Sequence, residues 1–577
     1  MMRLTHTRAA AAALCLILPA GWSTPARQRR AGRAGSVAKR LDEFVSRHAA
    51  YGFSGAVLVA DRGRVLLHKG YGRADRGRGV PNTAQTVFPL GSITKQLTAA
   101  AVYKLEAKGR LKVGDPIGKY LRGVPTEMAG VTILHLLTHS AGISRDADSV
   151  ADAGATRGEF VASVLRVPPA SRPGERYSYS NAGYGLLAAV VEEVTGRTFE
   201  SYLRGELFRP AGLSHTGWRP EFDSRLFARG YQEQFSAGSG EATFPPVASW
   251  RFLGSGSVVG TVGDLYRWNE ALYGEAVLTA AAREKLFKPA FDDYVNGWWT
   301  TKTRRGEEVS YSDGDFPGYQ ITLARLPARR AAVIIAVNND AGWGRRLSLG
   351  LQDVLAGETY ELPPAVVRLD AGRLSNFAGR YGLPSGATFE VRASDGALLV
   401  GAAGQEAVSA LAGVAASEEA RLAAANSATA ELAAHLRRGD FDWLKSVTEF
   451  QSAAPLERLR GFWERMLRGK GGLKNVEIVG TTPARGGRTQ TVVRFDLERG
   501  SEFWLLLWQG GKLRGWDVDT AAPGLTRFLP VSPEEFASLD VATGRVTRIR
   551  FSTGAGGRVA ALSTAIAGEE KRARRIQ

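Results

Sequence analysis

Apolar and polar positions alternate in two separated parts of the first 358 residues, and helical spacing lies between those parts. Residues 53–72, FSGAVLVADRGRVLLHKGYG, predict two strands joined by a turn at Asp61-Arg62-Gly63. After residue 295, the stretches EEVSYSDG, YQITLARL and AAVIIAVNN predict an antiparallel meander, because short turn sequences separate them. Helical patterns dominate from about 92 to 205. A sheet drawn from both ends of a segment, with helices between, predicts an α+β domain.

A linker and three further segments follow, as the chain length of 577 residues leads one to expect. Residues 359–372, TYELPPAVVRLDAG, predict a linker around the proline pair. Residues 373–417 are rich in strand signals, and residues 418–520 show helical stretches followed by aromatic-rich strands. Residues 521–577 include one more predicted hairpin, VTRIRFSTGAGGRVAALSTA.

The first 25 residues have the pattern of an export signal. Arg3 and Arg8 precede an apolar run from Ala9 to Ala20 that is too short to span a bilayer comfortably. We therefore expect an exported protein, periplasmic or extracellular, with tethering by an uncleaved signal as the alternative. Residues 26–51 predict a basic leader followed by an N-terminal helix, in which Val37, Leu41 and Val45 have helical spacing.

Charge and cysteine content exclude several classes of function. The formal net charge of +18 would suit nucleic acid, but the arginines are spread along the chain without a recognition motif, so no nucleic-acid partner is expected. The local basic cluster in residues 27–40 favours association with anionic envelope surfaces. The single cysteine, Cys15, lies inside the export signal, so the mature chain has no thiol chemistry. The histidines lack metal-ligand spacing, so we expect neither a metal nor another cofactor.

Candidate chemistry begins at GSITKQLTAAAVYKLEAKGRL, which predicts an amphipathic helix starting at Gly91, with Ile93, Leu97, Ala101 and Leu105 on one side. Ser92 and Lys95 are three residues apart and therefore project from one face of its first turn. A serine hydroxyl beside a lysine whose pKa burial lowers is suited to nucleophilic catalysis.

A second element places Tyr179 and Asn181 on a turn just before another helix, in PGERYSYSNAGYGLLAAVVEEVTG. A tyrosine near a lysine can share a proton, and an asparagine can orient that lysine or hold a substrate amide. The same Tyr-x-Asn spacing recurs at Tyr294 and Asn296, where the pattern favours a strand residue.

Together these stretches resemble the serine-reactive family of class C β-lactamases, D-stereospecific peptidases, related esterases and penicillin-binding proteins. The resemblance runs from about Gly52 to Glu358, and its quoted stretches include FPLGSITKQLTA, VTILHLLTHSAGI, GSGSVVGTVGDLYRWNEAL and the DFPGY turn. It implies a β-lactamase/transpeptidase-like domain over residues 52–358. In that domain Ser92 would be the acylated nucleophile, Lys95 its base partner, Tyr179 a second proton carrier and Asn181 the substrate-amide contact.

The family's third motif begins with His or Lys on a strand, and here Ser312-Asp313-Gly314 stands in its place. Strand alternation predicts that Ser312 and Gly314 face the cleft and Asp313 faces away. Losing a charge-assisted hydrogen bond costs about 1.5–3 kcal/mol, so the change weakens carboxylate recognition more than it harms the nucleophile. The resemblance assigns the oxyanion hole to the N–H groups of Ser92 and Asp315, and an acidic side chain at 315 would oppose the oxyanion unless it turns away. A second match, His215-Thr216-Gly217, lies in helix-to-turn sequence and is interpreted as a coincidence.

The C-terminal third carries two more resemblances. Residues 373–417 and 521–577 resemble two halves of the small β-barrel-like module that often follows this catalytic domain. Residues 418–520 would then be an inserted domain, similar to the nuclear-transport-factor-like α+β fold. Four tryptophans of that insert could line a pocket, although core filling is the more frequent role; they are Trp443, Trp463, Trp504 and Trp508.

The sequence thus predicts an exported serine hydrolase that acts through an acyl-enzyme on a small-molecule or peptide substrate. Ester, D-amino-acid peptide and β-lactam remain open as substrates, and no oligomeric state is assigned. Two alternatives stay beside it: an impaired relative that binds cell-envelope peptides without turnover, and envelope-peptide binding through the appended domains.

Overall fold

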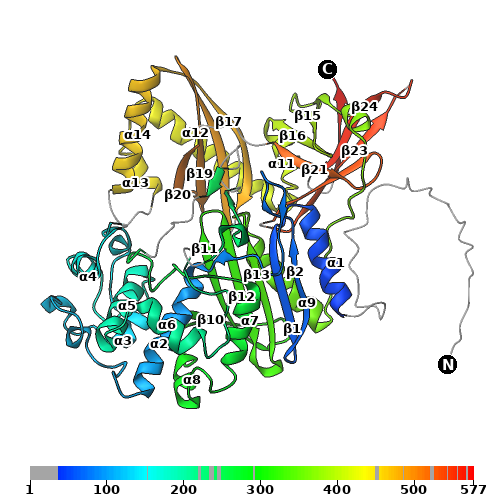
Figure 1. The fold of residues 1–577 in the computed structure, drawn as a ribbon. Helices are drawn as coiled ribbons and strands as arrows, with labels where there is room; N and C mark the ends of the chain where they lie inside the picture. Colours follow the sequence, from blue (N-terminus) through cyan, green and yellow to red (C-terminus); the bar gives the residue numbers. More distant parts are fainter. Residues whose placement is uncertain are drawn as a thin grey trace, which may run out of the picture.

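The computed structural model describes residues 37–576 except 153, 219–221, 233–239, 243–248, 290, 292, 449–453, 485–486, 520–524, 542, 555 and 567–568 (Figure 1). The predicted export signal, residues 1–25, and most of the basic leader lie outside the described residues. Among the helices that the structure describes, none combines the length and apolar character needed to cross a bilayer.

A seven-stranded antiparallel sheet forms the centre of the first domain, in the order β2-β1-β13-β12-β11-β10-β9. Its strands are β1 (Gly55–Asp61), β2 (Arg64–Tyr71), β9 (Tyr294–Val295), β10 (Trp298–Lys302), β11 (Glu308–Phe316), β12 (Tyr319–Leu326) and β13 (Ala331–Val337). The N-terminal hairpin joins the meander through β1 and β13, which pair from Gly55↔Val337 onward. The predicted hairpin, the meander and the α+β class are all confirmed.

Two helices cover one face of this sheet, α1 (Val37–Ala50) and α9 (Trp343–Ala356) (Figure 1). Phe44 of α1 and Leu347 of α9 pack with Val57 and Ile335 of the sheet in one apolar cluster. The two helices approach so closely that a Cβ atom added to Gly350 of α9 would lie 2.2 Å from the ring of Phe44.

A helical block covers the other face (Figure 1). It contains α2 (Thr94–Ala107), α3 (Ile133–Leu137), α4 (Arg157–Leu165), α5 (Asn181–Thr195), α6 (Phe199–Leu203), the π-helix η5 (Arg204–Phe208), α7 (Val262–Ala271) and α8 (Ala280–Leu286). Short strand pairs link its loops: β3 (Arg73–Asp75) with β4 (Val80–Pro81), β5 (Phe88–Pro89) with β8 (Val259–Gly260), and β6 (Gly230–Gln232) with β7 (Gly240–Ala242).

The prediction of an amphipathic helix beginning at Gly91 was wrong in two respects. The α-helix α2 begins at Thr94, after the 3-10 turn η1 (Gly91–Ile93), and eleven of its fourteen residues are buried. Its polar side chains are tolerated inside because they are hydrogen-bonded. Gln96 Oε1 accepts from Trp268 Nε1 at 3.1 Å, and Thr98 Oγ1 donates to the carbonyl of Gly254 at 2.7 Å.

Strands from two separated segments close a β-barrel, as the resemblance implied. They are β14 (Gly379–Gly382), β15 (Thr388–Ser394), β16 (Ala397–Ala403), β21 (Thr526–Pro530), β22 (Glu535–Leu539), β23 (Val546–Thr553), β24 (Val559–Ile566) and β25 (Glu569–Arg575), and the short α10 (Ala371–Ser375) precedes them. The sequence analysis missed β25, because EEKRARR lacks apolar alternation. Its backbone nevertheless completes the barrel, pairing with β14 at Tyr381↔Arg575.

The segment between the two barrel halves forms a four-stranded antiparallel sheet with helices beside it (Figure 1). It comprises α11 (Gln405–Leu411), α12 (Glu419–Arg437), α13 (Leu444–Val447), α14 (Ala454–Lys470), β17 (Leu473–Ala484), β18 (Arg488–Leu497), β19 (Gly500–Gln509) and β20 (Lys512–Asp519). Trp463, Trp504 and Trp508 are buried in its core, whereas Trp443 is half-buried and stacks on His435 at 4.4 Å between ring centroids. Core filling therefore accounts for three of the four tryptophans.

The close contact at Gly350 yields a stability prediction. Gly350→Ala should gain about 1 kcal/mol of helix propensity, but forcing a methyl group against Phe44 costs about 1–3 kcal/mol. We expect a lower thermal unfolding midpoint in differential scanning fluorimetry. Leu349→Ala is the control, because Leu349 is 55% exposed on the same helix and should change the midpoint little. A midpoint raised by Gly350→Ala would contradict the described packing of α1 on α9.

Candidate active site

The nucleophile candidate lies where β11 crosses the start of α2. Gly91 has φ +52°, a conformation that favours glycine, and a Cβ atom added there would lie 3.1 Å from the backbone nitrogen of Asp315. A Cβ atom added to Gly314 would lie 2.1 Å from the carbonyl oxygen of Leu90 and 3.2 Å from the backbone nitrogen of Ser92. Two glycines thus bring the backbones of Ser92 and Asp315 together.

Three of the predicted catalytic side chains meet at one point. The Tyr179 hydroxyl lies 2.7 Å from Ser92 Oγ, and Lys95 Nζ lies 3.1 Å from the same oxygen. The expectation that Ser92 and Lys95 share one face of a helical turn agrees with this geometry. Tyr179 arrives from the loop before α5, 87 residues along the chain.

Lys95 is buried, with 1% of its surface exposed, and its amine has three hydrogen-bond partners. Nζ donates to Asn181 Oδ1 at 2.8 Å and to the carbonyl of Ser255 at 3.0 Å, and Ser92 Oγ is the third partner. Burial lowers the pKa of Lys95 to about 7, because the charged form loses its hydration, and the charge of Asp148 opposes this shift. Since the amide and carbonyl oxygens can only accept, a neutral amine directs its lone pair at Ser92.

Tyr179 is held by a residue that the sequence analysis did not single out, His139. The two rings lie 4.4 Å apart between centroids, and the backbone N–H groups of Ser178 and Ser180 donate to the His139 carbonyl at 2.7 Å and to Nδ1 at 3.1 Å. Because Nδ1 accepts a hydrogen bond, the neutral ring has its hydrogen on Nε2, which donates to the hydroxyl of Tyr294 at 3.0 Å. Burial, together with the nearby charge of Lys95, lowers the pKa of His139 well below its ordinary value.

Tyr294 therefore belongs to this support and not to a second Tyr-x-Asn site. Its hydroxyl lies 3.3 Å from that of Tyr184, which donates to the carbonyl of Leu137 at 2.8 Å. Asn296, the other half of that spacing, donates from Nδ2 to the carbonyl of Leu286 at 3.1 Å. This network is neutral and fully buried behind Tyr179.

The loop before β8 supplies the carbonyl of Ser255, which the sequence analysis also missed. Thr98 of α2 fixes the preceding residue through the bond to the Gly254 carbonyl. A Cβ atom on Gly254 would lie 2.2 Å from the carbonyl oxygen of Tyr184. Glycine at 254 thus lets this loop lie against α5 and bring its next carbonyl to Lys95.

Strand β11 places Ser312 and Gly314 on the face toward the helical block, as predicted. Ser312 pairs with Leu323 and Gly314 with Ile321, and both partners belong to the core shared with that block. Asp313 and Asp315 point to the opposite face, where they accept hydrogen bonds from Thr322 Oγ1 at 2.7 Å and Gln320 Nε2 at 3.4 Å. Burial raises the pKa of Asp313. The carboxylate of Asp315 would not oppose an oxyanion at Ser92, because the side chain is turned to the other face of the sheet.

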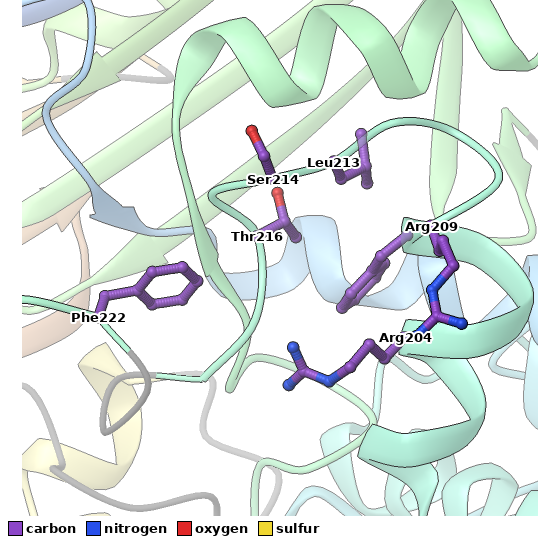
Figure 2. A pocket seen from close by; sticks show the side chains of 7 residues that line it. Arg204, Arg209, Leu213, Ser214, Thr216 and Phe222 are labelled. Atoms are coloured by element: carbon purple, nitrogen blue, oxygen red, sulfur yellow. The ribbon is translucent and has the colours of Figure 1, made fainter.

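The second sequence match, His215-Thr216-Gly217, lies elsewhere. The backbone N–H of His215 donates to Asp264 Oδ2 at 2.6 Å, and Thr216 Oγ1 donates to the same oxygen at 2.9 Å. Thr216 lines a different pocket of about 340 Å³ (Figure 2), whose other lining residues are Arg204, Phe208, Arg209, Leu213, Ser214 and Phe222. None of the three residues that meet at Ser92 Oγ lines it, in agreement with the interpretation as a coincidence.

Across the described residues, no group of three or more His, Cys, Asp or Glu side chains has the arrangement of a metal site. At Ser92 the structure brings together a hydroxyl, a buried amine and a phenol.

Comparisons with known proteins agree with this geometry. The family model described as Beta-lactamase matches residues 37–357. Penicillin-binding protein 4* of Bacillus subtilis (strain 168) is 28% identical over 391 residues, which cover 61% of this chain and 84% of that protein. The structure of the octameric penicillin-binding protein homologue from Pyrococcus abyssi covers 93% of this chain and 99% of its own, with 18% identity and a TM-score of 0.51. That last likeness concerns the fold alone. Since the family model spans more than half of the residues, the chain belongs to the β-lactamase family.

Proposed function

We propose that this protein is an exported serine hydrolase that cleaves an ester or amide through an acyl-enzyme on Ser92. The observation that carries the proposal is the amine of Lys95, which is buried, has two obligate acceptors and reaches Ser92 Oγ at 3.1 Å. A serine with a positioned base of matched pKa is the arrangement that nucleophilic catalysis requires. Export is supported by the pattern of residues 1–25.

The proposed reaction has two halves. Neutral Lys95 takes the proton of Ser92 as Oγ attacks the carbonyl carbon, and the N–H groups of Ser92 and Asp315 stabilise the developing oxyanion. The leaving alcohol or amine takes a proton from the Lys95–Tyr179 pair, so the acyl-enzyme forms with Lys95 neutral again. Water then attacks the acyl carbon, gives its proton to the same pair, and releases the carboxylic acid as Ser92 regains its hydrogen.

The selectivity follows from Ser312. The face of β11 toward the helical block carries Ser310, Ser312, Gly314 and Phe316, none of which is basic. A substrate carboxylate would therefore lack the charge partner that this strand supplies in the family. We propose that the enzyme prefers neutral acyl donors and is a poor β-lactamase. The rival function, binding without turnover, is favoured by the same substitution.

Substitution of the nucleophile tests the reaction type. With a chromogenic short-chain ester in stopped flow, the wild type should show a burst followed by steady turnover. Ser92→Ala should lose both, because replacing a catalytic serine costs on the order of 10⁶ in rate. Ser385→Ala, in the barrel domain, is the control and should behave as wild type. A burst without turnover would support the binding protein, and turnover that survives Ser92→Ala would exclude the proposed mechanism.

The pKa of Lys95 predicts the pH dependence. A lysine at its ordinary pKa of 10.5 would be neutral in about one molecule in three thousand at pH 7, whereas a pKa of about 7 leaves half of the amines neutral. Since the base must be neutral, kcat/KM should fall about tenfold per pH unit below pH 7 and level off above it. Initial rates from pH 5 to 9 measure this. A flat profile through pH 7 would contradict the role of Lys95 as base.

Restoring the cation tests the selectivity. Ser312→Lys should raise kcat/KM for an ester bearing a free carboxylate about ten- to 150-fold relative to its neutral analogue, which corresponds to 1.5–3 kcal/mol. Ser312→Ala should leave the ratio for the two esters near that of the wild type. An unchanged ratio in the lysine variant would mean that position 312 does not face the substrate carboxylate.

A further inference from the structure

A carboxylate outside the predicted site lies beside the N-terminus of α5. Asp148 belongs to the 3-10 turn η4 (Arg145–Ser149). Its Oδ1 accepts hydrogen bonds from Ser180 Oγ at 3.1 Å and from the backbone N–H of Ala182 at 2.8 Å. Its Oδ2 accepts from Asn181 Nδ2 at 3.3 Å. One carboxylate therefore binds the helix terminus with one oxygen and the side chain of Asn181 with the other.

The bond to Nδ2 determines which way the amide of Asn181 points. A carboxylate can only accept, so the NH₂ group of Asn181 must face Asp148 and its Oδ1 must face Lys95, where the distance is 2.8 Å. In the flipped amide, Asn181 Oδ1 would face the carboxylate oxygen of Asp148, and Asn181 Nδ2 would face the amine of Lys95. Neither contact would be a hydrogen bond of the kind that the observed orientation makes. Asn181 is thus held in the one orientation that gives Lys95 an acceptor.

The orientation of Asn181 decides where the lone pair of Lys95 points. With Asn181 Oδ1 and the Ser255 carbonyl as acceptors for two hydrogens, the third tetrahedral position of the neutral amine faces Ser92 Oγ at 3.1 Å. A flipped Asn181 would offer a donor to the amine and compete for that lone pair. The reactive geometry of Lys95 therefore depends on a residue that does not touch it.

We propose that Asp148 is a positioning residue of this site, whose carboxylate fixes the amide of Asn181 so that Lys95 directs its lone pair at Ser92. This inference rests on the proposed function. A simpler role is that of a helix cap, since acidic groups stabilise helix N-termini. The cap role requires only Oδ1, whereas the positioning role also requires Oδ2 as the acceptor for Asn181 Nδ2.

The charge of Asp148 makes its effect on Lys95 visible in the acid limb of the pH profile, and the plateau of that profile reports the orientation of Asn181. The polar and titratable groups around Lys95 come from several elements: Ser92, Tyr179, Asn181, Tyr184, the carbonyl of Ser255, the neutral ring of His139, and Asp148. The backbone carbonyl of Asp148 in turn accepts from Nε of the Arg251 guanidinium at 2.9 Å. Of these, Asp148 carries the negative charge that raises the pKa of Lys95 against the effect of burial. Removing it leaves the amine neutral down to lower pH. The acid limb of kcat/KM should therefore move to lower pH.

Asp148→Asn tests this with an isosteric, uncharged side chain. Its NH₂ group would replace the acceptor that faces Asn181 and favour the flipped amide. We expect the midpoint of the acid limb to move to lower pH by on the order of one unit. We also expect the plateau of kcat/KM to drop roughly tenfold. Asp148→Glu keeps the charge, so its acid limb should stay near that of the wild type. Asp146→Asn is the matched control, since Asp146 lies on the same turn, is exposed and accepts from Ser144 Oγ.

Circular dichroism and unfolding midpoints accompany each profile, and Asp148→Ser replaces Asp148→Asn if the latter does not fold. A lower unfolding midpoint with an unchanged plateau of kcat/KM would assign Asp148 a cap role only and overturn the inference, and so would an unchanged profile. If the wild type shows no turnover that depends on Ser92, the proposed function itself fails. That failure can be told apart from failure of the positioning role, because the activity of Ser92→Ala is measured before any variant of Asp148 is compared.

Discussion

Burial of one amine is the constraint on which the rest of the first domain depends. A lysine with 1% of its surface exposed is tolerated only where its hydrogens have partners and its charge can be shed. Those partners come from α5 and from the loop before β8, which the chain must bring to the first turn of α2 from 86 and 160 residues away. Helix α2 is therefore enclosed on nearly every side. Its polar residues, such as Thr98, form buried hydrogen bonds to neighbouring segments. The same enclosure that makes the amine reactive fixes the arrangement of the helical block on the sheet.

Sequence reasoning found the residues whose chemistry lies in their side chains and whose spacing is local. Ser92 and Lys95 share one helical turn, and strand alternation correctly placed Ser312 apart from Asp313. It also predicted the hairpin and meander, because their periodicity is that of an ordinary antiparallel sheet. The prediction that α2 is amphipathic was wrong because an alanine-rich helix can be buried on all sides when its Thr and Gln side chains are hydrogen-bonded. The spacing of large apolar residues does not reveal such burial.

The supporting residues escaped sequence reasoning for physical reasons. Ser255 contributes a carbonyl that any residue type would provide, so its side chain carries no signal. His139 acts through a positive φ of 54° and through backbone bonds to the loop before α5, which only the folded chain displays. Asp148 is one of two acids in a short turn, and its proposed role arises from a contact with Asn181, 33 residues away along the chain. Strand β25 was missed because most of its side chains are charged and exposed, and of its residues only the small Ala573 enters the barrel core.

The junction between the barrel and the inserted segment has a consequence for the history of the chain. Strands β16 and β21 are antiparallel neighbours, paired from Leu398↔Phe528 to Val400↔Thr526, although more than a hundred residues separate them. A two- to five-residue hairpin is the usual connection for such a pair. The insert therefore occupies the place of an ordinary loop, and its gene segment could have entered or left there without disturbing the barrel ladder. Helix α11 contacts both sides of that boundary, since Ala407 and Ala410 belong to the barrel core and Gln405 donates from Nε2 to the carbonyl of Thr481 in β17 at 3.0 Å. The ladder between β16 and β21 is thus formed by residues that flank the insert and not by residues within it.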